Sequence, residues 1–463
     1  MSAAPNVVLS LISHTNVGKT TLARTLLRRD VGEVLDQAHV TDATERFVLH
    51  DVGGASLVLS DNPGFGDSVR LLSRLRGLPD PLAWLVGQVW DRFRDRPLFC
   101  SQEAARHVRD EADAVLYLVN ASEDPEQAGY VAPELELLGW IGRPVVLLLN
   151  QTGPPRDAAA RERDTARWRA VRERHPVVAD VLPLDAFTRC WVQEGLLWER
   201  VRDVLPADRR PLLDAWLARW RDDQAAIFRG SADALAALLA VAATDVEPIR
   251  AGGRRELRRA ADALGRRLRE AVAAANERLI ELHGLDGEAA EAVRIELGDV
   301  TAPEPPPPGW LRTVWGGLLG GAVGGVAADL ATGGFTLGGG ALVGAILGAA
   351  GGRGLAFGME LLRSGDAAPR AAWSRAFAER LATDTVLRYL AVAHFGRGAG
   401  SFRVRDHPET FRAAAERAVG ARHERLRGAT AAEIVPTLER ALLEALAELH
   451  PEGAHLLPAP RGA

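Results

Sequence analysis

The chain has 463 residues, of which 47% are hydrophobic and 25% are charged, and its formal net charge is -5. The length predicts about three domains, and this composition excludes an intrinsically disordered chain. The small negative charge argues against general binding to nucleic acid. The two cysteines, Cys100 and Cys190, lack metal or redox spacing, and no signal-peptide pattern is seen at the N-terminus, so we expect a cytoplasmic protein.

Residues 1–205 alternate short apolar runs with helical patterns. This alternation is typical of an α/β domain with a mostly parallel sheet and helices on both faces. Buried strands are predicted at Val7–Ile12, Ser56–Ser60, Ala114–Val119, Pro144–Leu149 and Val177–Leu182. No further strand is expected after Leu205, where the predicted domain ends.

A phosphate-binding motif follows the first predicted strand. The segment Ser13-His14-Thr15-Asn16-Val17-Gly18-Lys19-Thr20 fits the pattern Gly-x-x-x-x-Gly-Lys-Ser/Thr except at its first position. In such a loop, backbone N–H groups and the first turn of the following helix bind the phosphates. Lys19 is the only lysine of a chain with 56 basic residues, and a compact ammonium suits this loop better than a planar guanidinium. The motif predicts that the chain binds a nucleoside phosphate.

A second element, Asp61-Asn62-Pro63-Gly64, stands at the end of the second predicted strand. We expect Lys19 to bridge the β- and γ-phosphates and the Thr20 hydroxyl to coordinate Mg²⁺. Asp61 can hold the shell of the same ion, and the Gly64 N–H can reach the γ-phosphate. The predicted nucleotide-binding residues of the two elements are Ser13, Asn16, Val17, Gly18, Lys19, Thr20, Thr21, Asp61 and Gly64.

The pattern after Leu205 is helical. Residues 206–300 carry apolar stripes at three- and four-residue spacing, which predict a helical region. Residues 301–310 include four consecutive prolines and predict a stiff linker. Residues 361–463 return to amphipathic helical patterns, so the whole C-terminal region is predicted to be all-α.

Residues 311–360, between the linker and the last helical region, are rich in glycine. Glycines recur every four residues, as at Gly316, Gly320 and Gly324, a glycine-zipper pattern that lets two helices approach closely. The uncharged runs 313–328 and 330–352 contain 16 and 23 residues, and the second is long enough to cross a bilayer. We predict a helical hairpin that inserts into or docks on a membrane. The alternative is a soluble hairpin packed against the flanking helices.

The two phosphate-site motifs carry a family resemblance. Asn16-Val17-Gly18-Lys19-Thr20, together with Asp61-Asn62-Pro63-Gly64-Phe65-Gly66, resembles the TrmE/Era-like class of small bacterial GTPases. The whole chain is most similar to bacterial proteins that join an Era-like GTPase domain to a helical region of unknown function. The resemblance implies GTP and GDP as ligands, Mg²⁺ as cofactor, K⁺ as a second cation, and a dimer of GTPase domains as one form of assembly.

The resemblance also implies roles for single residues. Asn16 matches the asparagine that can coordinate K⁺ in place of an arginine finger, and Phe65 stands where Ras-like proteins have a water-orienting glutamine. Thr41, with Thr44 as the alternative, matches the switch I threonine that completes the Mg²⁺ shell. The implied catalytic residues are Lys19, Asn16 and Thr41, and the implied metal ligands are Thr20, Thr41 and Asp61.

The base-binding motif departs from the class. Where the class has Asn-Lys-x-Asp, this chain has Asn150-Gln151-Thr152-Gly153. Asn150 is expected to tie the loops together, but Gly153 offers no carboxylate to guanine, which predicts weak selectivity for GTP over ATP. Asp157 is an alternative acceptor. By resemblance, the residues on the base side of the site are Asn150, Gln151, Asp185 and Ala186.

Together these features predict a GTPase at the cytoplasmic face of the inner membrane, whose GTPase domain is a nucleotide switch for a helical effector region. Its expected partners are GTP or GDP and, through residues 311–360, a lipid bilayer or a membrane protein. One alternative is a nucleotide-dependent scaffold with little hydrolysis, which Phe65 and the altered base motif allow. Another is a soluble Era-like RNA- or ribosome-associated factor. Nucleic acid is not favoured, because no RNA-binding motif is seen after residue 205.

Overall fold

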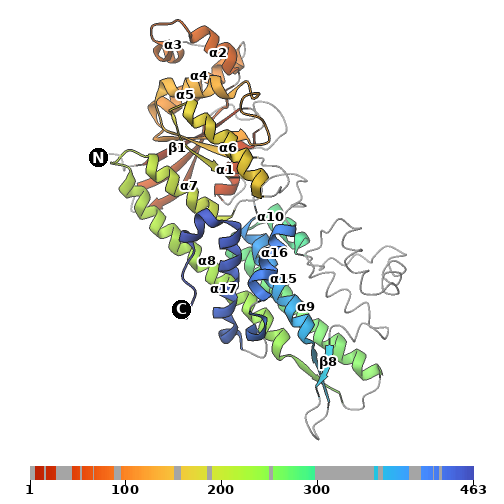
Figure 1. Cartoon of the computed structure of the whole chain (residues 1–463). Coiled ribbons are helices and arrows are strands. Elements are labelled where there is room, and N and C mark those ends of the chain that lie inside the picture. The colour runs from red at the N-terminus through yellow and green to blue at the C-terminus, as the bar shows by residue number, and fades with distance from the viewer. Residues whose placement is uncertain are drawn as a thin grey trace. The chain divides into compact units, whose positions relative to one another are not determined.

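The computed structural model describes residues 6–14, 17–27, 44–52, 55–65, 67–87, 95–150, 158–184, 190–249, 254–297, 359–362, 369–395, 408–420, 422–426 and 430–462. The chain divides into two compact units (Figure 1). The first is built mainly from Met1–Asp223, and the second from Gln224–His394 and His407–Ala463.

The first unit is built on a six-stranded sheet with strand order β2-β3-β1-β4-β5-β6. The strands are β1 (Val7–Ser13), β2 (Glu45–Val52), β3 (Ala55–Asp61), β4 (Ala114–Asn120), β5 (Val145–Asn150) and β6 (Val178–Pro183). β2 is antiparallel to β3, and all other neighbouring strands are parallel. β4 and β5 consist almost wholly of buried apolar residues, as expected of parallel strands covered on both faces. All five predicted strands are present.

The strand β2 was not predicted, because it lies at the edge of the sheet. Its residues mix charged and apolar side chains, and Val48 is 51% exposed. An antiparallel edge strand needs only one apolar face. It therefore lacks the continuous apolar run that marks the buried strands.

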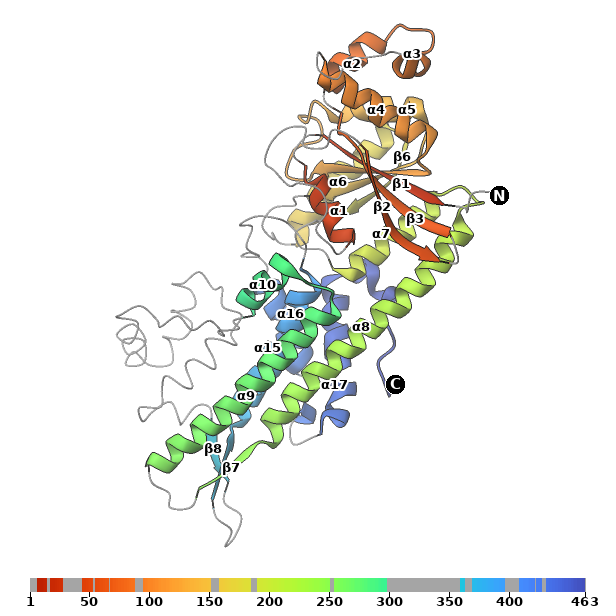
Figure 2. The same cartoon turned by 180° about the vertical axis from the view of Figure 1, so that it is seen from behind.

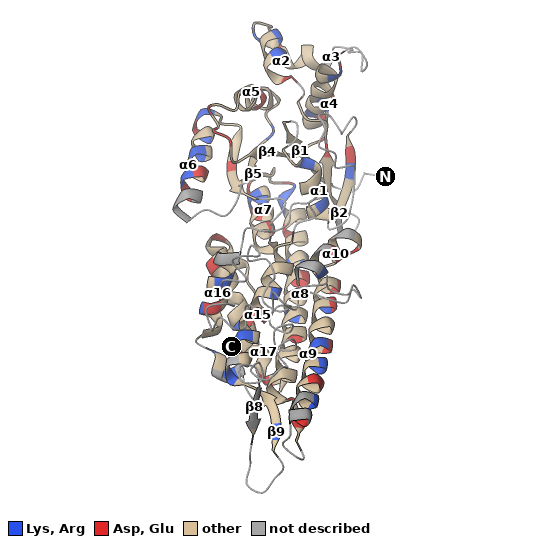
Figure 3. Cartoon of the chain, turned by 90° about the vertical axis from the view of Figure 1, so that its right-hand side faces the viewer, with Lys and Arg blue, Asp and Glu red and all other residues tan. Residues whose placement is uncertain are grey.

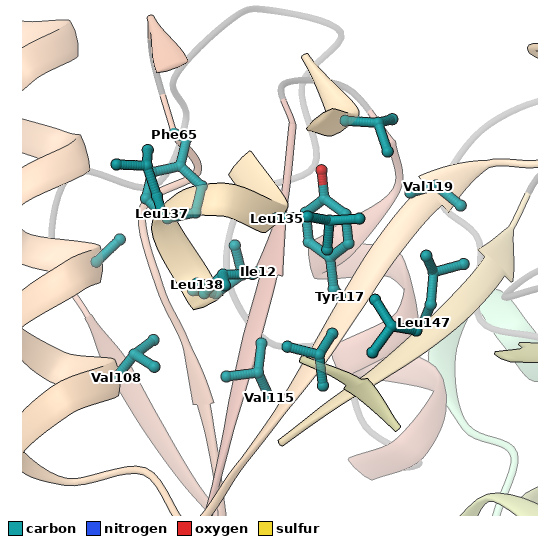
Figure 4. Close-up of a cluster of buried hydrophobic side chains, with 14 of the residues drawn as sticks. Ile12, Phe65, Val108, Val115, Tyr117, Val119, Leu135, Leu137, Leu138 and Leu147 are labelled. Carbon is teal, nitrogen blue, oxygen red and sulfur yellow. The ribbon is translucent and has the colours of Figure 1, made fainter. Parts of the chain in front are cut away.

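Helices cover both faces of this sheet (Figures 1 and 2). They are α1 (Lys19–Leu27), α2 (Ser68–Leu75), α3 (Pro81–Gly87), α4 (Arg96–Asp110), α5 (Val131–Ile141), α6 (Ala158–Arg174) and α7 (Trp191–Val204). α4 and α5 lie on one face, and α1 and α7 lie on the other. Between the sheet and α4 and α5 lies a core cluster that includes Ile12, Val115 and Leu138 (Figure 4). This core fixes the carboxyl ends of the central strands, where the predicted site lies.

The second unit is helical, as predicted. Its helices are α8 (Arg210–Thr244), α9 (Arg254–Leu282), α10 (Gly287–Glu296), α15 (Arg375–Ala393), α16 (Pro408–Gly420) and α17 (Ala431–Leu449), with short 3-10 helices η1 (His423–Leu426) and η2 (Pro451–Leu456). The boundary between the two compact units falls within α8, after Asp223. The first turns of α8 belong to the first unit because Trp216 packs edge-on against Trp198 of α7, with ring centroids 5.0 Å apart.

A buried arginine lies in the core of the second unit. Arg388 of α15 is 1% exposed, and its Nε donates to Asp384 Oδ2 at 2.7 Å. Its Nη1 donates to Asn276 Oδ1 of α9 at 3.0 Å and to the Leu297 carbonyl at 3.2 Å. The guanidinium therefore joins α15 to α9 and to the end of α10.

The second unit also contains a small antiparallel sheet, which corrects the all-α prediction. Its strands β7 (Val246–Pro248), β9 (Arg370–Trp373) and β8 (Met359–Leu362) pair in that order. Strands of three or four residues are too short to show an alternating pattern, and β7 pairs with a segment more than a hundred residues further along the chain. For these two reasons no strand is predicted after Leu205.

The predicted linker, residues 301–310, and the predicted glycine-rich hairpin up to residue 358 lie outside the described residues. Within the described part of the chain, α8 is the one helix whose length and composition would allow it to cross a membrane, and 44% of its most apolar stretch is buried. That is weak evidence for a span, because core helices of soluble proteins meet the same criteria. Figure 3 shows acidic and basic residues interspersed along α9, as on a solvated helix face.

Candidate nucleotide-binding site

The phosphate loop connects β1 to α1. Lys19 is the first residue of α1 and is 9% exposed. Gly18 has a φ of 91°, in the left-handed region that glycine adopts without strain. Most of the predicted loop residues are described, but Asn16 lies outside the described residues.

Lys19, Thr20 and Asp61 converge at the carboxyl ends of β1 and β3. These strands are parallel neighbours, and Leu11 pairs with Asp61, so the end of β3 lies beside the phosphate loop. Lys19 Nζ forms an ion pair with Asp61 Oδ1, and the Thr20 hydroxyl donates to Asp61 Oδ2 at 3.2 Å. Asp61 is only 2% exposed. The structure thus brings together the two motifs that stand 41 residues apart in the chain.

This group of side chains fits a magnesium ion. Mg²⁺ prefers oxygen ligands, and Thr20 and Asp61 supply a hydroxyl and a carboxylate. Thr41, the predicted third ligand, lies outside the described residues. Its alternative, Thr44, is described, and its hydroxyl donates to Asn62 Oδ1 at 2.8 Å. Thr44 is therefore bound to the segment that follows β3.

Gly64 lies against the phosphate loop. A Cβ atom at Gly64 would lie 2.5 Å from the Ser13 carbonyl oxygen, closer than side chains approach in real structures. The Asp61–Gly64 segment can therefore approach the loop this closely only with glycine at position 64. Such an approach suits the predicted contact of the Gly64 N–H with a γ-phosphate.

Phe65, the next residue, points away from this site. It is fully buried in the core cluster, and Figure 4 shows it beside Leu137 of α5. The side chain that stands in place of a water-orienting glutamine thus belongs to the hydrophobic core. It cannot hold a water molecule at the phosphates.

Asn150, at the end of β5, contacts the phosphate loop directly. Its Nδ2 donates to the Val17 carbonyl at 2.6 Å, and the residue is fully buried. This is the loop-to-loop contact that the sequence predicts for Asn150. The other predicted residues on the base side, Gln151, Asp185 and Ala186, lie outside the described residues, as does Asp157.

A buried cluster behind the phosphate loop was not predicted. His14 Nδ1 lies 2.8 Å from Glu134 Oε1, and the Tyr117 hydroxyl donates to Glu134 Oε2 at 2.8 Å. The Ser68 side chain, at the start of α2, also hydrogen-bonds to this carboxylate. Glu134 and Tyr117 are fully buried. The ring of His14 stacks on that of Tyr130, with centroids 4.2 Å apart and planes 13° apart.

The surroundings of His14 favour its protonated form. Burial lowers the pKa of His14, but the hydrogen bond and charge of Glu134, with the charge of Glu123, outweigh burial and raise the pKa. No local signal marks Glu134, since it is one of two glutamates in a largely apolar helix. Its partners come from three other elements, which only the folded chain brings together.

The fold and the site together define a P-loop GTPase. A mostly parallel sheet carries the phosphate loop after β1, an Asp-x-x-Gly segment after β3 and Asn150 at the end of β5. Residues 8–151 match the family described as 50S ribosome-binding GTPase. The chain therefore contains a GTPase domain similar to this family.

The rest of the chain identifies its family. Residues 180–443, more than half of the chain, match the family described as "Domain of unknown function (DUF3482)". The chain belongs to this family, with the GTPase domain preceding the DUF3482 region. No curated protein matches the chain.

Several solved structures of GTP-binding proteins are similar to the chain. A variant of Era from Aquifex aeolicus bound to GDP and aluminium fluoride is 18% identical, with 44% of this chain and 57% of that chain covered and a TM-score of 0.32. Era with MgGDPNP and a segment of 16S ribosomal RNA is 18% identical, with 44% and 58% covered and a TM-score of 0.32. A GTP-binding protein from Sulfolobus solfataricus in complex with GDP is 16% identical, with 43% and 52% covered and a TM-score of 0.28. The chain thus spans little more than half the length of these proteins.

Proposed function

We propose that this chain is a Mg²⁺-dependent GTPase that works at the cytoplasmic face of a membrane, and that its GTPase domain is a nucleotide switch for the helical region. The observation that carries the proposal is the convergence of Lys19, Thr20 and Asp61 beside the phosphate loop. An ammonium, a hydroxyl and a carboxylate are the groups that bind a nucleoside triphosphate and its Mg²⁺ in this class of site.

In the proposed reaction, water attacks the γ-phosphorus, the bond from that phosphorus to the bridging oxygen breaks, and GDP and phosphate are released. Lys19 would exchange Asp61 for the β- and γ-phosphate oxygens and so neutralise part of their charge. Thr20 and Asp61 would hold the Mg²⁺, which when bound offsets further phosphate charge. The Gly64 N–H would bind the γ-phosphate, so that catalysis is mostly positional and electrostatic.

Hydrolysis is expected to be slow and to depend on K⁺. The burial of Phe65 supports this expectation, because it leaves no side chain at that position to orient water. A K⁺ ion bound through Asn16 would supply the missing positive charge. Turnover measured in K⁺ and in Na⁺ tests this, with Asn16→Ala as the matched variant. Equal rates in the two salts would favour the alternative that the chain is a scaffold that binds nucleotide without useful turnover.

Guanine is proposed as the preferred base, with weaker selectivity than in relatives that have Asn-Lys-x-Asp. Competition of GTP, ATP and XTP for one fluorescent nucleotide tests this. A preference for ATP would overturn the GTPase proposal. Strong selectivity for GTP that is lost in Asp157→Ala would identify Asp157 as the substitute carboxylate.

Membrane association is proposed on the sequence of residues 313–352, with its four-residue glycine spacing and two uncharged runs. Fractionation of the full-length protein, with salt and carbonate washes, tests whether it is bound to membranes. Deletion of residues 313–352 should release it while nucleotide binding is retained. A full-length protein that is soluble and monodisperse without detergent or lipid would overturn this part of the proposal.

A further inference from the structure

Glu134 has no place in the proposed nucleotide chemistry, yet its partner His14 belongs to the phosphate loop. We propose that Glu134 is a positioning residue, which holds His14 and thereby fixes the start of the phosphate loop for nucleotide binding. This inference rests on the proposed function, because it assumes that the loop binds a nucleotide.

The position of His14 in the fold explains why the loop needs this support. The pairing of β1 with β4 ends with Ile12 opposite Tyr117 and Ser13 opposite Leu118. His14 is therefore the first residue beyond the pairing that holds β1 to β4. From that point the contact with Glu134 holds the chain in place of the strand pairing, because α5 is anchored in the core through Leu135.

The ring of His14 is restrained in two directions. Its Nδ1 contacts Glu134 at 2.8 Å in the plane of the ring, and its face stacks on Tyr130. Tyr130 is itself held, since its hydroxyl donates to Glu123 Oε2 at 3.0 Å. A hydrogen bond in the plane and a stacked face together leave the imidazole one orientation.

The partners of Glu134 also argue against a purely structural role. A buried carboxylate costs free energy unless it is hydrogen-bonded, and apolar side chains can often replace such a group in a core. Two of the three partners lie in segments next to the predicted phosphates: His14 is in the loop, and Ser68 follows Gly64 by four residues. The third, Tyr117, comes from the central strand β4.

The test measures the dissociation constant of a fluorescent GDP analogue for the full-length protein. His14→Ala and Glu134→Ala should each weaken binding about tenfold, the equivalent of one lost hydrogen bond to a charged group. If Glu134 acts through His14, the double variant should be no weaker than either single variant. Tyr117→Phe is the matched control, because it removes another bond to the same carboxylate without touching the loop. It should bind within about twofold of the wild type.

Two further measurements separate positioning from loss of folding. Partial unfolding lowers the binding stoichiometry and leaves the dissociation constant of the folded fraction unchanged. A misplaced loop raises the dissociation constant and leaves the stoichiometry unchanged. Glu134→Gln keeps the size and hydrogen-bonding capacity of the side chain and should restore most of the affinity. If Glu134→Ala does not fold, His14→Ala and Glu134→Gln decide between the two roles.

The outcomes distinguish this inference from the function on which it rests. If the wild type binds no guanine nucleotide, the proposed GTPase function fails. If the wild type binds and Glu134→Ala binds equally well, the positioning role alone is overturned. Additive effects of His14→Ala and Glu134→Ala, or a Tyr117→Phe variant as weak as Glu134→Ala, would overturn it too.

Discussion

Each of the two units buries one lysine or arginine side chain among the residues that the structure describes. In the GTPase unit it is Lys19, which is 9% exposed and pairs with Asp61. In the helical unit it is Arg388, which is 1% exposed and donates to Asp384, Asn276 and a backbone carbonyl. Both are buried ion pairs, but their partners lie in different places: one beside the phosphate loop, the others in the core of the helical unit.

The difference shows how the choice between lysine and arginine indicates the role of a buried positive charge. A guanidinium is planar and rigid. That of Arg388 donates to acceptors from several elements and so holds these helices together. The Lys19 ammonium is a compact charge at the edge of a loop, and it can exchange one oxygen partner for another. The first arrangement suits a core, and the second suits a site that binds and releases a phosphate.

The largest effect should come from removing the buried arginine. Arg388→Ala leaves Asp384 buried without its counter-charge and should destabilise the protein by about 3–5 kcal/mol, with nucleotide affinity unchanged. Urea unfolding of the full chain measures this change. The matched control is Arg375→Ala in the same helix, because Arg375 forms an exposed pair with Glu379 and should contribute less than about 1 kcal/mol. Equal losses in the two variants would contradict the structural role of Arg388.

A different pattern is expected for Lys19. Lys19→Ala should weaken nucleotide binding at least about a hundredfold, because charge-assisted bonds to phosphate are lost. Lys19→Arg should fail as well, since the planar guanidinium does not fit the loop. Titration with a fluorescent nucleotide measures both. Arg24→Ala, at the other end of α1, serves as the control and should bind normally. Wild-type affinity in Lys19→Arg would show that the loop accepts a guanidinium and would contradict this prediction.

Another buried basic side chain, that of His107, is held in its neutral form. The pKa of His107 is lowered to about 4 by burial and by the charge of Arg46. Its Nε2 has no hydrogen-bond partner among the described residues. Between pH 6.5 and about 4, His107 binds a proton in the unfolded chain but not in the folded chain. Its contribution to the free energy of unfolding is therefore fully present above pH 6.5 and is lost as the pH falls to about 4. The loss should be roughly 2–3 kcal/mol, as measured by unfolding across this pH range.

His107→Gln removes the titrating group and should flatten this part of the stability profile. His455→Gln, at an exposed position, is the control and should leave the profile as it is. A profile that stays equally steep in His107→Gln would assign the acid sensitivity to another group.

The smallest effect is expected at Gly64. In Gly64→Ala the new Cβ would collide with the Ser13 carbonyl oxygen, so the segment after β3 must move away from the loop. Binding of a non-hydrolysable GTP analogue should weaken about tenfold, the equivalent of one hydrogen bond to the γ-phosphate. Gly129→Ala is the control, since a Cβ there meets nothing within 4 Å. Unchanged binding in Gly64→Ala would show that this close approach is not used.

The fold of the GTPase unit could largely be predicted, because its central strands are continuous apolar runs, as in β4 and β5. The exceptions have physical reasons. β2 has one solvent-facing side. In the helical unit, β7, β8 and β9 are strands of only three or four residues, and β7 pairs with a segment more than a hundred residues further along the chain. The boundary at Asp223 could not be read either, because it falls inside the continuous helix α8.

Residues of the candidate site could be predicted where the residue type and its position in a motif indicate one chemical role. A lone lysine after Gly18 and an aspartate at a strand end are both predicted at the phosphate site, and in the structure Lys19 lies against Asp61. Glu134 was not predictable, because a glutamate in a helix is usually a surface residue. Its role depends on His14, Tyr117 and Ser68, which the fold assembles from three other elements.

The contact between Asn150 and the Val17 carbonyl has a consequence for how such a protein can change over time. The Asn150 amide supports the phosphate loop through the protein backbone and needs no contact with the base to do so. A change at the neighbours Gln151 or Gly153 would therefore leave this bond from Asn150 to the phosphate loop in place. In this arrangement the support of the phosphate loop and the choice of base depend on different residues, so that one can change in evolution while the other is kept.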